Sequence, residues 1–88
     1  MRIKYLKSAE KDVRKINSKK VRASIKKILL LIKEVESLKE IPSLKKISGH
    51  PSAFRIRVGD YRIGLYYLEE TIIIARIVKR NDIYKVFP

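Results

Sequence analysis

The stretch from Ala53 to Tyr67 reads A-F-R-I-R-V-G-D-Y-R-I-G-L-Y-Y, and it decides the fold. Apolar and polar side chains alternate on both sides of Gly59 and Asp60, and a period of two is typical of strands with one buried face. Glycine and aspartate suit the tight turn between two antiparallel strands, because both tolerate positive φ. The stretch therefore predicts a β-hairpin with these two residues as its loop.

The loop also sets the register of this hairpin. Arg57 then lies opposite Arg62, and Arg55 lies on the same face as both. The other face carries the apolar side chains and one tyrosine: Phe54, Ile56, Val58, Tyr61, Ile63 and Leu65. Like charges opposite one another destabilise a sheet by up to ~1 kcal/mol, and guanidinium groups suit phosphate oxygens. The three arginines therefore indicate a polyanion site, and the alternative is a surface hairpin that is merely basic.

Composition limits the class of protein. The chain has 88 residues, 45% of them hydrophobic, which predicts one small domain spanning residues 1–88. Its 22 Lys and Arg outnumber nine Asp and Glu, and the formal charge of +13 favours nucleic acid or an acidic protein as partner. The absence of cysteine excludes disulfides, a thiol nucleophile and a cysteine-ligated metal.

The sequence also bears on location. Its N-terminal segment lacks the long apolar run of a signal peptide. The longest apolar candidate, Ile25 to Ile32, contains Lys26 and Lys27 and is far shorter than the ~20 residues of a membrane span. We therefore expect a cytoplasmic protein that does not bind a membrane, and the lack of cysteine fits that compartment.

Strand and helix patterns precede the hairpin. Residues Arg2 to Leu6 alternate and predict a first strand. Helical spacing of apolar residues predicts two helices, at Ala9 to Ile16 and at Lys19 to Ser37. Ser8 and Ser18 precede these segments and are expected to be their N-caps.

A loop and a strand complete the chain. Leu38 to Ser52 is punctuated by proline and glycine and predicts a loop, with Leu44 and Ile47 under the edge of the sheet. His50, the only histidine, is expected at the surface of this loop and not as a catalytic base. Thr71 to Val78 is β-branched and nearly continuous, which predicts a central strand buried on both faces.

The element order is β-α-α-β-β-β. It predicts an α+β fold, with a mainly antiparallel sheet and an αα-hairpin packed on one face. The arginine face is then left open to solvent. The pattern of the last strand does not fix its register, so Arg76 faces either this basic surface or a partner inside the protein.

This order and two motifs resemble the RelE/ParE superfamily of toxins from type II toxin–antitoxin operons. The motifs are F-R-I-R-V-G-D-Y-R-I-G, from Phe54 to Gly64, and V-K-R-N-D-I-Y, from Val78 to Tyr84. The approach from Leu44 to Gly49 also fits, so the resemblance covers essentially the whole chain. It implies a RelE-like microbial ribonuclease fold and two classes of activity. RelE-like members cut mRNA in the ribosomal A site, and ParE-like members inhibit DNA gyrase.

The resemblance also implies which residues act. In the RelE-like branch these are basic residues on the hairpin strands, an arginine after the turn, and an arginine and a tyrosine near the C-terminus. The matching residues here are Arg55, Arg57, Arg62, Arg80 and Tyr84. Their presence favours the ribonuclease branch. Many members have lysine on the first hairpin strand, where this chain has arginine, and histidine where it has Lys79. These departures leave the general base open, and they leave open a toxin homologue that acts only by binding.

The expected reaction is attack of a ribose 2′-OH on the adjacent phosphodiester, which calls for no metal or cofactor because the substrate supplies the nucleophile. Arg62 and Arg80 are expected to clamp phosphate. Tyr84 either stacks on a base, orients the 2′-OH or closes the core, and Lys79 is the nearest candidate base. The residues expected to contact RNA are Arg55, Arg57, Lys79, Arg76 and Lys46. The expected partners are mRNA and an acidic antitoxin that is disordered when free.

Overall fold

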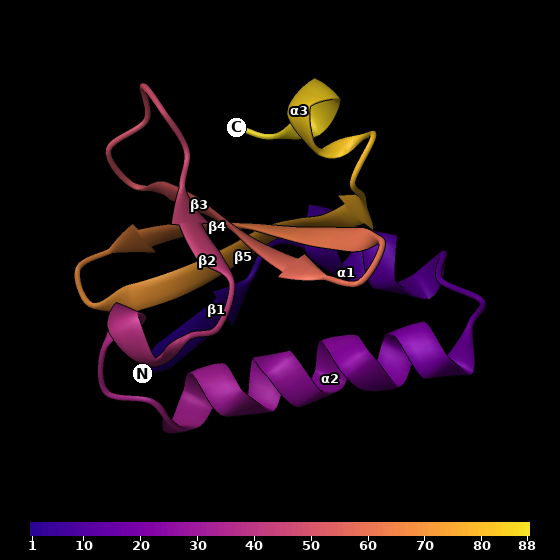
Figure 1. Cartoon of the computed structure of the whole chain (residues 1–88), viewed down its shortest axis with the longest axis horizontal. Helices are drawn as coiled ribbons and strands as arrows, with labels where there is room; N and C mark the ends of the chain where they lie inside the picture. The colour runs from indigo at the N-terminus through magenta and orange to yellow at the C-terminus, as the bar shows by residue number, and fades with distance from the viewer.

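The hairpin at Gly59 and Asp60 lies within a five-stranded sheet in a computed structural model that describes all 88 residues (Figure 1). The strands run in the order β1-β5-β4-β3-β2. Their bounds are β1 Arg2–Tyr5, β2 Leu44–Lys46, β3 Ala53–Val58, β4 Tyr61–Leu68 and β5 Thr71–Lys79. β1 pairs with β5 in parallel, and the other pairs are antiparallel. The expected α+β class and mainly antiparallel sheet are confirmed.

The register of the hairpin is the one that the alternation predicts. Arg57 pairs with Arg62, and Arg55 pairs with Gly64. Only Gly59 of the loop has a positive φ, +59°, as in a turn that needs glycine at its first central position. The apolar face of the hairpin contributes Ile56, fully buried, to the main core.

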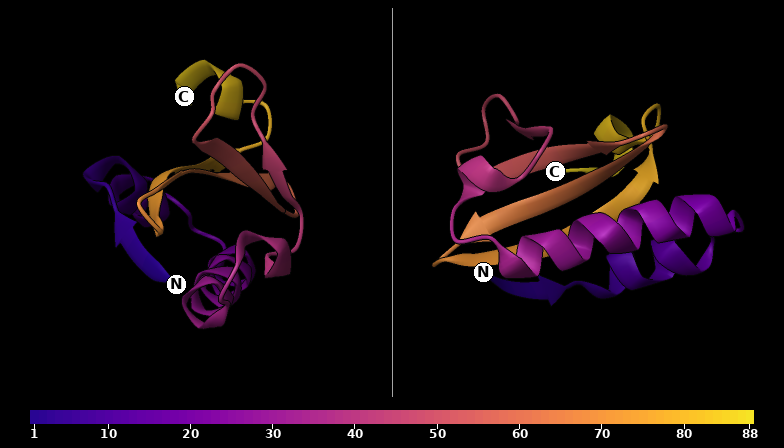
Figure 2. Two further views of the ribbon diagram at one scale, coloured as in Figure 1. Left: turned by 90° about the vertical axis from the view of Figure 1, so that its left-hand side faces the viewer. Right: turned by 60° about the horizontal axis from the view of Figure 1, so that its bottom comes forward.

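Two helices cover that apolar face (Figures 1 and 2). They are α1, Lys7–Arg14, and α2, Lys19–Glu34, and a 3-10 turn, η1, follows at Leu38–Glu40. The hydroxyl of Ser18 accepts a hydrogen bond from the Val21 N–H at 3.2 Å, which confirms the expected cap of α2. α2 ends three residues before the expected Ser37, because the backbone is extended at Val35.

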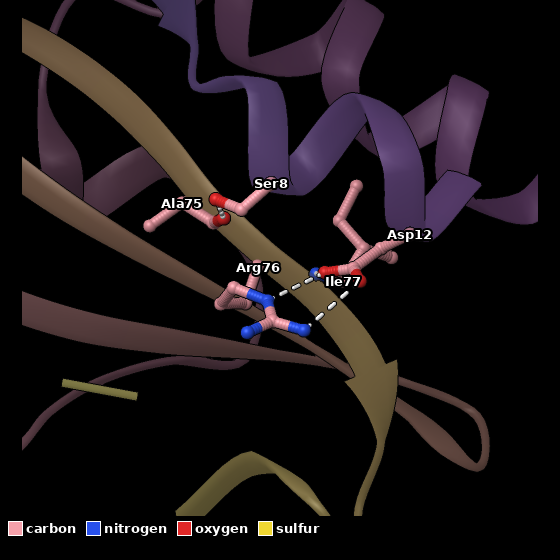
Figure 3. Close-up of polar contacts among 5 residues, drawn as sticks. All are labelled: Ser8, Asp12, Ala75, Arg76 and Ile77. Atoms are coloured by element: carbon pink, nitrogen blue, oxygen red, sulfur yellow. Dashed lines mark hydrogen bonds and ion pairs between the residues drawn. The ribbon is translucent and has the colours of Figure 1, made fainter. Parts of the chain in front are cut away.

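The expected cap at Ser8 is wrong. α1 begins at Lys7 with Leu6 in the N-cap position, and the Ser8 hydroxyl instead donates to the carbonyl oxygen of Ala75 at 2.6 Å. The bond is made at the edge of β5, where β1 has already ended at Tyr5. Asp12, one turn further along α1, accepts the Ile77 N–H at 2.9 Å (Figure 3). Side chains of α1 therefore satisfy the edge of β5 that β1 leaves unpaired.

The opposite face of the sheet is only partly open, which corrects the expectation for it. A short C-terminal helix, α3 at Ile83–Val86, lies over this face beside the loop between β2 and β3 (Figures 1 and 2). A second, smaller core forms there from Ile47, Ala53, Ala75, Ile83 and Phe87. Leu44 packs on the main core instead, so Leu44 and Ile47 lie on opposite faces of the sheet. No helix in the fold has both the length and the apolar character needed to span a bilayer.

Candidate functional site

The uncovered part of this second face carries the arginines of the hairpin. Arg55 and Arg57 come from β3 and Arg62 from β4, all on the side away from α1 and α2. Arg57 is exposed, and the other two are half-buried. The backbone register thus places these three residues on one face of the sheet, as predicted.

Arg62 is fixed by the hairpin turn. Its Nη1 donates to the carbonyl oxygens of Gly59 and Tyr61, each at 2.9 Å. Desolvation lowers the pKa of Arg62, and the charges of neighbouring arginines lower it further. Arg62 nevertheless stays a cation, because an arginine side chain does not lose its proton near neutral pH. The site therefore holds an oriented cation among like charges, which an incoming anion would stabilise.

Arg80 joins this cluster from the other end of the chain. It follows β5 directly, and its backbone N–H donates to the Asp60 carbonyl oxygen at 2.9 Å. Its Nε also lies 3.4 Å from Oδ1 of Asp60. The charges that lower the pKa of Arg62 are those of Arg57, Arg55 and Arg80, in that order, so three other arginines lie close enough to act on Arg62.

Tyr84 lies beside the cluster on α3. The guanidinium carbon of Arg55 is 5.9 Å from the centre of its ring, within the range of a cation–π contact. Tyr84 is 64% exposed, which contradicts a role in closing the core. That role belongs to Phe87, whose ring centre lies 5.0 Å from that of Tyr66.

Two lysines expected at the RNA surface lie on the other side of the sheet. Lys46 pairs with Phe54, whose side chain packs on the main core. Lys79 pairs with Tyr61, which also packs on that core, and it lines a hollow with Asp12 and other residues near α1. Both lysines are exposed but belong to the face that carries the helices, so neither stands with the arginines. The structure therefore does not bring Lys79, the nearest candidate base, together with the arginines.

Arg76 is held by a carboxylate instead of facing a free surface. Its Nε donates to Oδ2 of Asp12 at 2.8 Å and its Nη2 to Oδ1 at 3.0 Å (Figure 3). This hydrogen bond is the main cause that raises the pKa of Arg76. Of the two alternatives left open for Arg76, the paired one is correct, and its guanidinium ties α1 to β5.

Sequence reasoning missed two residues of the site. Lys45 pairs with Arg55 and so shares its face, in the position where Lys46 was expected. Asp60 is the carboxylate that touches the cluster. The alternation of Leu44, Lys45, Lys46 and Ile47 could have identified the first, but a segment between proline and glycine gave little reason to look for a strand. His50 is exposed, as expected.

The arrangement suits one kind of chemistry. Planar guanidinium groups can bind phosphate oxygens in pairs, and an exposed phenol ring beside them can stack on a base. Arg62 is oriented before any ligand arrives, so it needs little rearrangement to stabilise added negative charge. The site therefore fits a single-stranded nucleic acid phosphate.

Comparisons with known proteins point the same way. Residues 3–84 match a family model described as the ParE toxin of the type II toxin–antitoxin system, parDE. The chain is 36% identical over 89 residues to a protein named Toxin RelE3 from Methanocaldococcus jannaschii, with 100% of both chains covered. Family model and relative both extend over the arginine face and the C-terminal tyrosine.

Solved structures show the same fold. A RelB–RelE antitoxin–toxin complex from Methanococcus jannaschii matches with a TM-score of 0.82 and 35% identity, over 97% of this chain and 99% of that one. The isolated RelE toxin of E. coli matches with a TM-score of 0.70 and 23% identity, over 96% and 90% of the two chains. Sequence and structure together place the chain in the RelE/ParE superfamily of type II toxin–antitoxin toxins.

Proposed function

We propose that this toxin is an endoribonuclease that cuts mRNA in the ribosomal A site and so inhibits translation. The observation that carries the proposal is the gathering of Arg55, Arg57, Arg62 and Arg80 on one face, with Tyr84 beside them. By the resemblance described above, these residues match those that carry the activity in the RelE-like branch. The activity would place the protein where ribosomes work, in the cytoplasm.

The proposed reaction is an internal transesterification. The ribose 2′ oxygen bonds to phosphorus while the bond from phosphorus to the 5′ oxygen breaks. The 2′-OH gives up a proton, and the departing 5′ oxygen gains one. The products are a 2′,3′-cyclic phosphate and a 5′-OH end, so the strand is cut without a nucleophile from the protein.

The arginines supply what this reaction needs most, which is stabilisation of the extra negative charge on phosphorus. The guanidinium of Arg62 is anchored to two carbonyl oxygens of the turn, so this cation is in place before RNA binds. The backbone N–H of Arg80 is bound to the third carbonyl oxygen, which holds the start of the Arg80 side chain beside the same turn. A preorganised donor of this kind typically contributes about 100-fold or more to the rate. Tyr84 is exposed and free to stack on the base next to the cut.

The proposal is tested by translating a defined mRNA in vitro and mapping the cut ends. We expect Arg62→Ala and Arg80→Ala each to slow cutting by about 100-fold. Lys46→Ala is the matched control, because it removes an exposed cation from the other face, and it should leave cutting within about threefold of the wild type. Undiminished cutting by both arginine variants, with the fold retained, would remove the face from the reaction.

Inhibition of DNA gyrase is the second candidate, because the matching family model is described by the ParE toxin. The same basic face would then bind the gyrase–DNA complex. A supercoiling assay without ribosomes separates the two. Inhibition there, together with intact mRNA in the translation assay, favours the gyrase inhibitor.

We also propose an acidic antitoxin as partner. The relative from Methanococcus jannaschii was solved as a complex with an antitoxin, and this chain carries a formal charge of +13. A largely disordered acidic chain can wrap such a surface and fold on it. Co-expression with the acidic protein encoded beside the toxin gene, followed by size-exclusion chromatography, tests this.

A further inference from the structure

Asp60 places a carboxylate beside the arginine cluster. It occupies the second position of the loop between β3 and β4. The carbonyl oxygens of Gly59 and Tyr61 accept hydrogen bonds from the Arg62 side chain, and the carbonyl oxygen of Asp60 accepts one from the backbone N–H of Arg80. Both residues are therefore attached to this one turn. The carboxylate of Asp60 contacts the Arg80 side chain, and its charge also acts on Arg62.

The contact between the Asp60 carboxylate and Arg80 is loose. Nε of Arg80 lies 3.4 Å from Oδ1 of Asp60, whereas a charge-assisted hydrogen bond of this kind is usually about 2.7–2.9 Å long. The two side chains are 63% and 70% exposed. An exposed pair of this length contributes little to the stability of the fold. The terminal nitrogens of Arg80 make no hydrogen bond in the structure, so they are free for another anion.

The electrostatics of Arg62 show what the carboxylate does for the cluster. Desolvation and three arginines lower the pKa of Arg62, and Asp60 is the charge that raises it. Asp60 therefore offsets part of the repulsion among the arginines while no ligand is bound. A phosphate group at the same place would do so more fully.

We propose that Asp60 is a displaceable internal counter-anion of the arginine cluster, a stand-in for phosphate that RNA must replace on Arg80. The proposal rests on the proposed binding of RNA phosphate at this face. It makes Asp60 a residue that limits affinity: it competes with RNA for the arginines, and it restores their charge balance when RNA leaves.

The test measures affinity without cutting. The probe is a short single-stranded RNA in which every 2′-OH is replaced by 2′-O-methyl, and binding is followed by fluorescence anisotropy at low and moderate salt. We expect Asp60→Asn to bind this RNA about three- to tenfold more tightly than the wild type at low salt. The gain should shrink at moderate salt, because screening weakens exposed charges. Asp60→Glu should bind like the wild type, since it keeps the charge.

Asp82→Asn is the matched control. It makes the same chemical change at an exposed aspartate that pairs with Lys85 at 3.7 Å, so it alters the net charge equally. We expect it to change affinity by less than about twofold. Equal gains for both variants would mean that only net charge matters, and unchanged or weaker binding by Asp60→Asn would mean that the carboxylate does not compete. Either result overturns the proposal.

A second measurement separates this proposal from the proposed function. In NMR spectra of the RNA-free protein, Asp60→Asn should shift the Nε–H signal of Arg80, and Asp82→Asn should not. The 2′-O-methyl RNA should move that signal in the wild type. If it moves as expected but no mRNA is cut on ribosomes, the ribonuclease proposal fails while the counter-anion stands. If RNA binds and leaves the Arg80 signal unmoved, the counter-anion fails.

Discussion

At the scale of single residues, the position of Gly64 decides how closely the C-terminal segment approaches the sheet. A Cβ atom there would lie 2.6 Å from Cδ2 and 2.7 Å from Cγ of Phe87, closer than side chains approach one another. Gly64 has no positive φ, so the requirement is space and not backbone conformation. Gly64 lies on the same face of β4 as Arg62, so this face of the strand contributes both to the second core, through the contact with Phe87, and to the site.

We expect Gly64→Ala to destabilise the protein by about 1–3 kcal/mol, because the ring of Phe87 must move from the sheet. Urea denaturation measures this as a lower midpoint with an unchanged m-value. In a Phe87→Ala background the same change should cost far less, because the contact has gone. Equal costs in the two backgrounds would show that the ring is not the obstacle.

Asp12 is the second residue on which much depends. Its side chain is 5% exposed, and it accepts hydrogen bonds from Arg76 and from the N–H of Ile77. Asp12→Ala leaves both donors without their partner, so we expect a loss of about 3–5 kcal/mol in the free energy of unfolding. Glu10→Ala, an exposed acid on the same helix, is the control and should change stability by less than about 0.5 kcal/mol. Similar losses for the two would contradict the structural role of Asp12.

The residues that could be predicted are those whose place is set locally. Arg57 and Arg62 face each other because the loop between them is two residues long, and the sequence shows that loop directly. The side on which Lys79 lies depends instead on the register of β5 against β4. A shift of one residue exchanges the two faces of a strand, and β5 also has an irregularity opposite Gly64 and Leu65. Nothing within the strand reports such a shift.

At the scale of elements, β2 and α3 are short elements of the site that the sequence pattern does not predict. β2 has three residues and α3 has four, too few for a period to show. β2 exists because the edge of β3 is available to pair with it, and α3 exists because Ile83 and Phe87 pack on the second core. Both depend on tertiary contacts, and they add Lys45 and Tyr84 to the site.

The turn between β4 and β5 is an element under strain. Glu69 and Glu70 have φ of 49° and 59°, a left-handed conformation that residues with a side chain adopt at a cost of about 1–2 kcal/mol. We expect Glu70→Gly to raise the free energy of unfolding by about 0.5–1 kcal/mol, since glycine enters this region freely. Glu36→Gly, at a position without positive φ, is the control and should be neutral or destabilising. Thermal unfolding compares them, and equal shifts for the two would contradict the strain.

At the scale of the whole molecule, charge is unevenly distributed along β4. The arginine cluster lies at the start of β4, next to the loop that contains Asp60. The turn with Glu69 and Glu70 lies at the other end of this strand. Two further acids, Glu34 and Glu36, line a hollow together with Glu70. Arg2 lies among these acids, so positive and negative charges are mixed at that end, whereas four arginines stand against Asp60 at the other. A polyanion is therefore expected to be drawn to the arginine cluster.

The net positive charge should make the stability of the protein depend on salt, and the arginine cluster should make it depend on which anion the salt contains. Raising ionic strength from about 0.01 to 0.1 M shortens the screening length from about 30 to 10 Å, so added salt should stabilise a protein of charge +13 by weakening its self-repulsion.

At equal ionic strength we expect sulfate to raise the melting temperature more than chloride, because its oxygens bind the arginines that repel one another around Arg62. The double variant Arg62→Gln and Arg80→Gln should keep the chloride effect and lose the extra sulfate effect, as measured by differential scanning calorimetry. An extra sulfate effect that survives in this variant would place the bound anion elsewhere on the surface. Its loss would show that stability and phosphate binding depend on the same side chains.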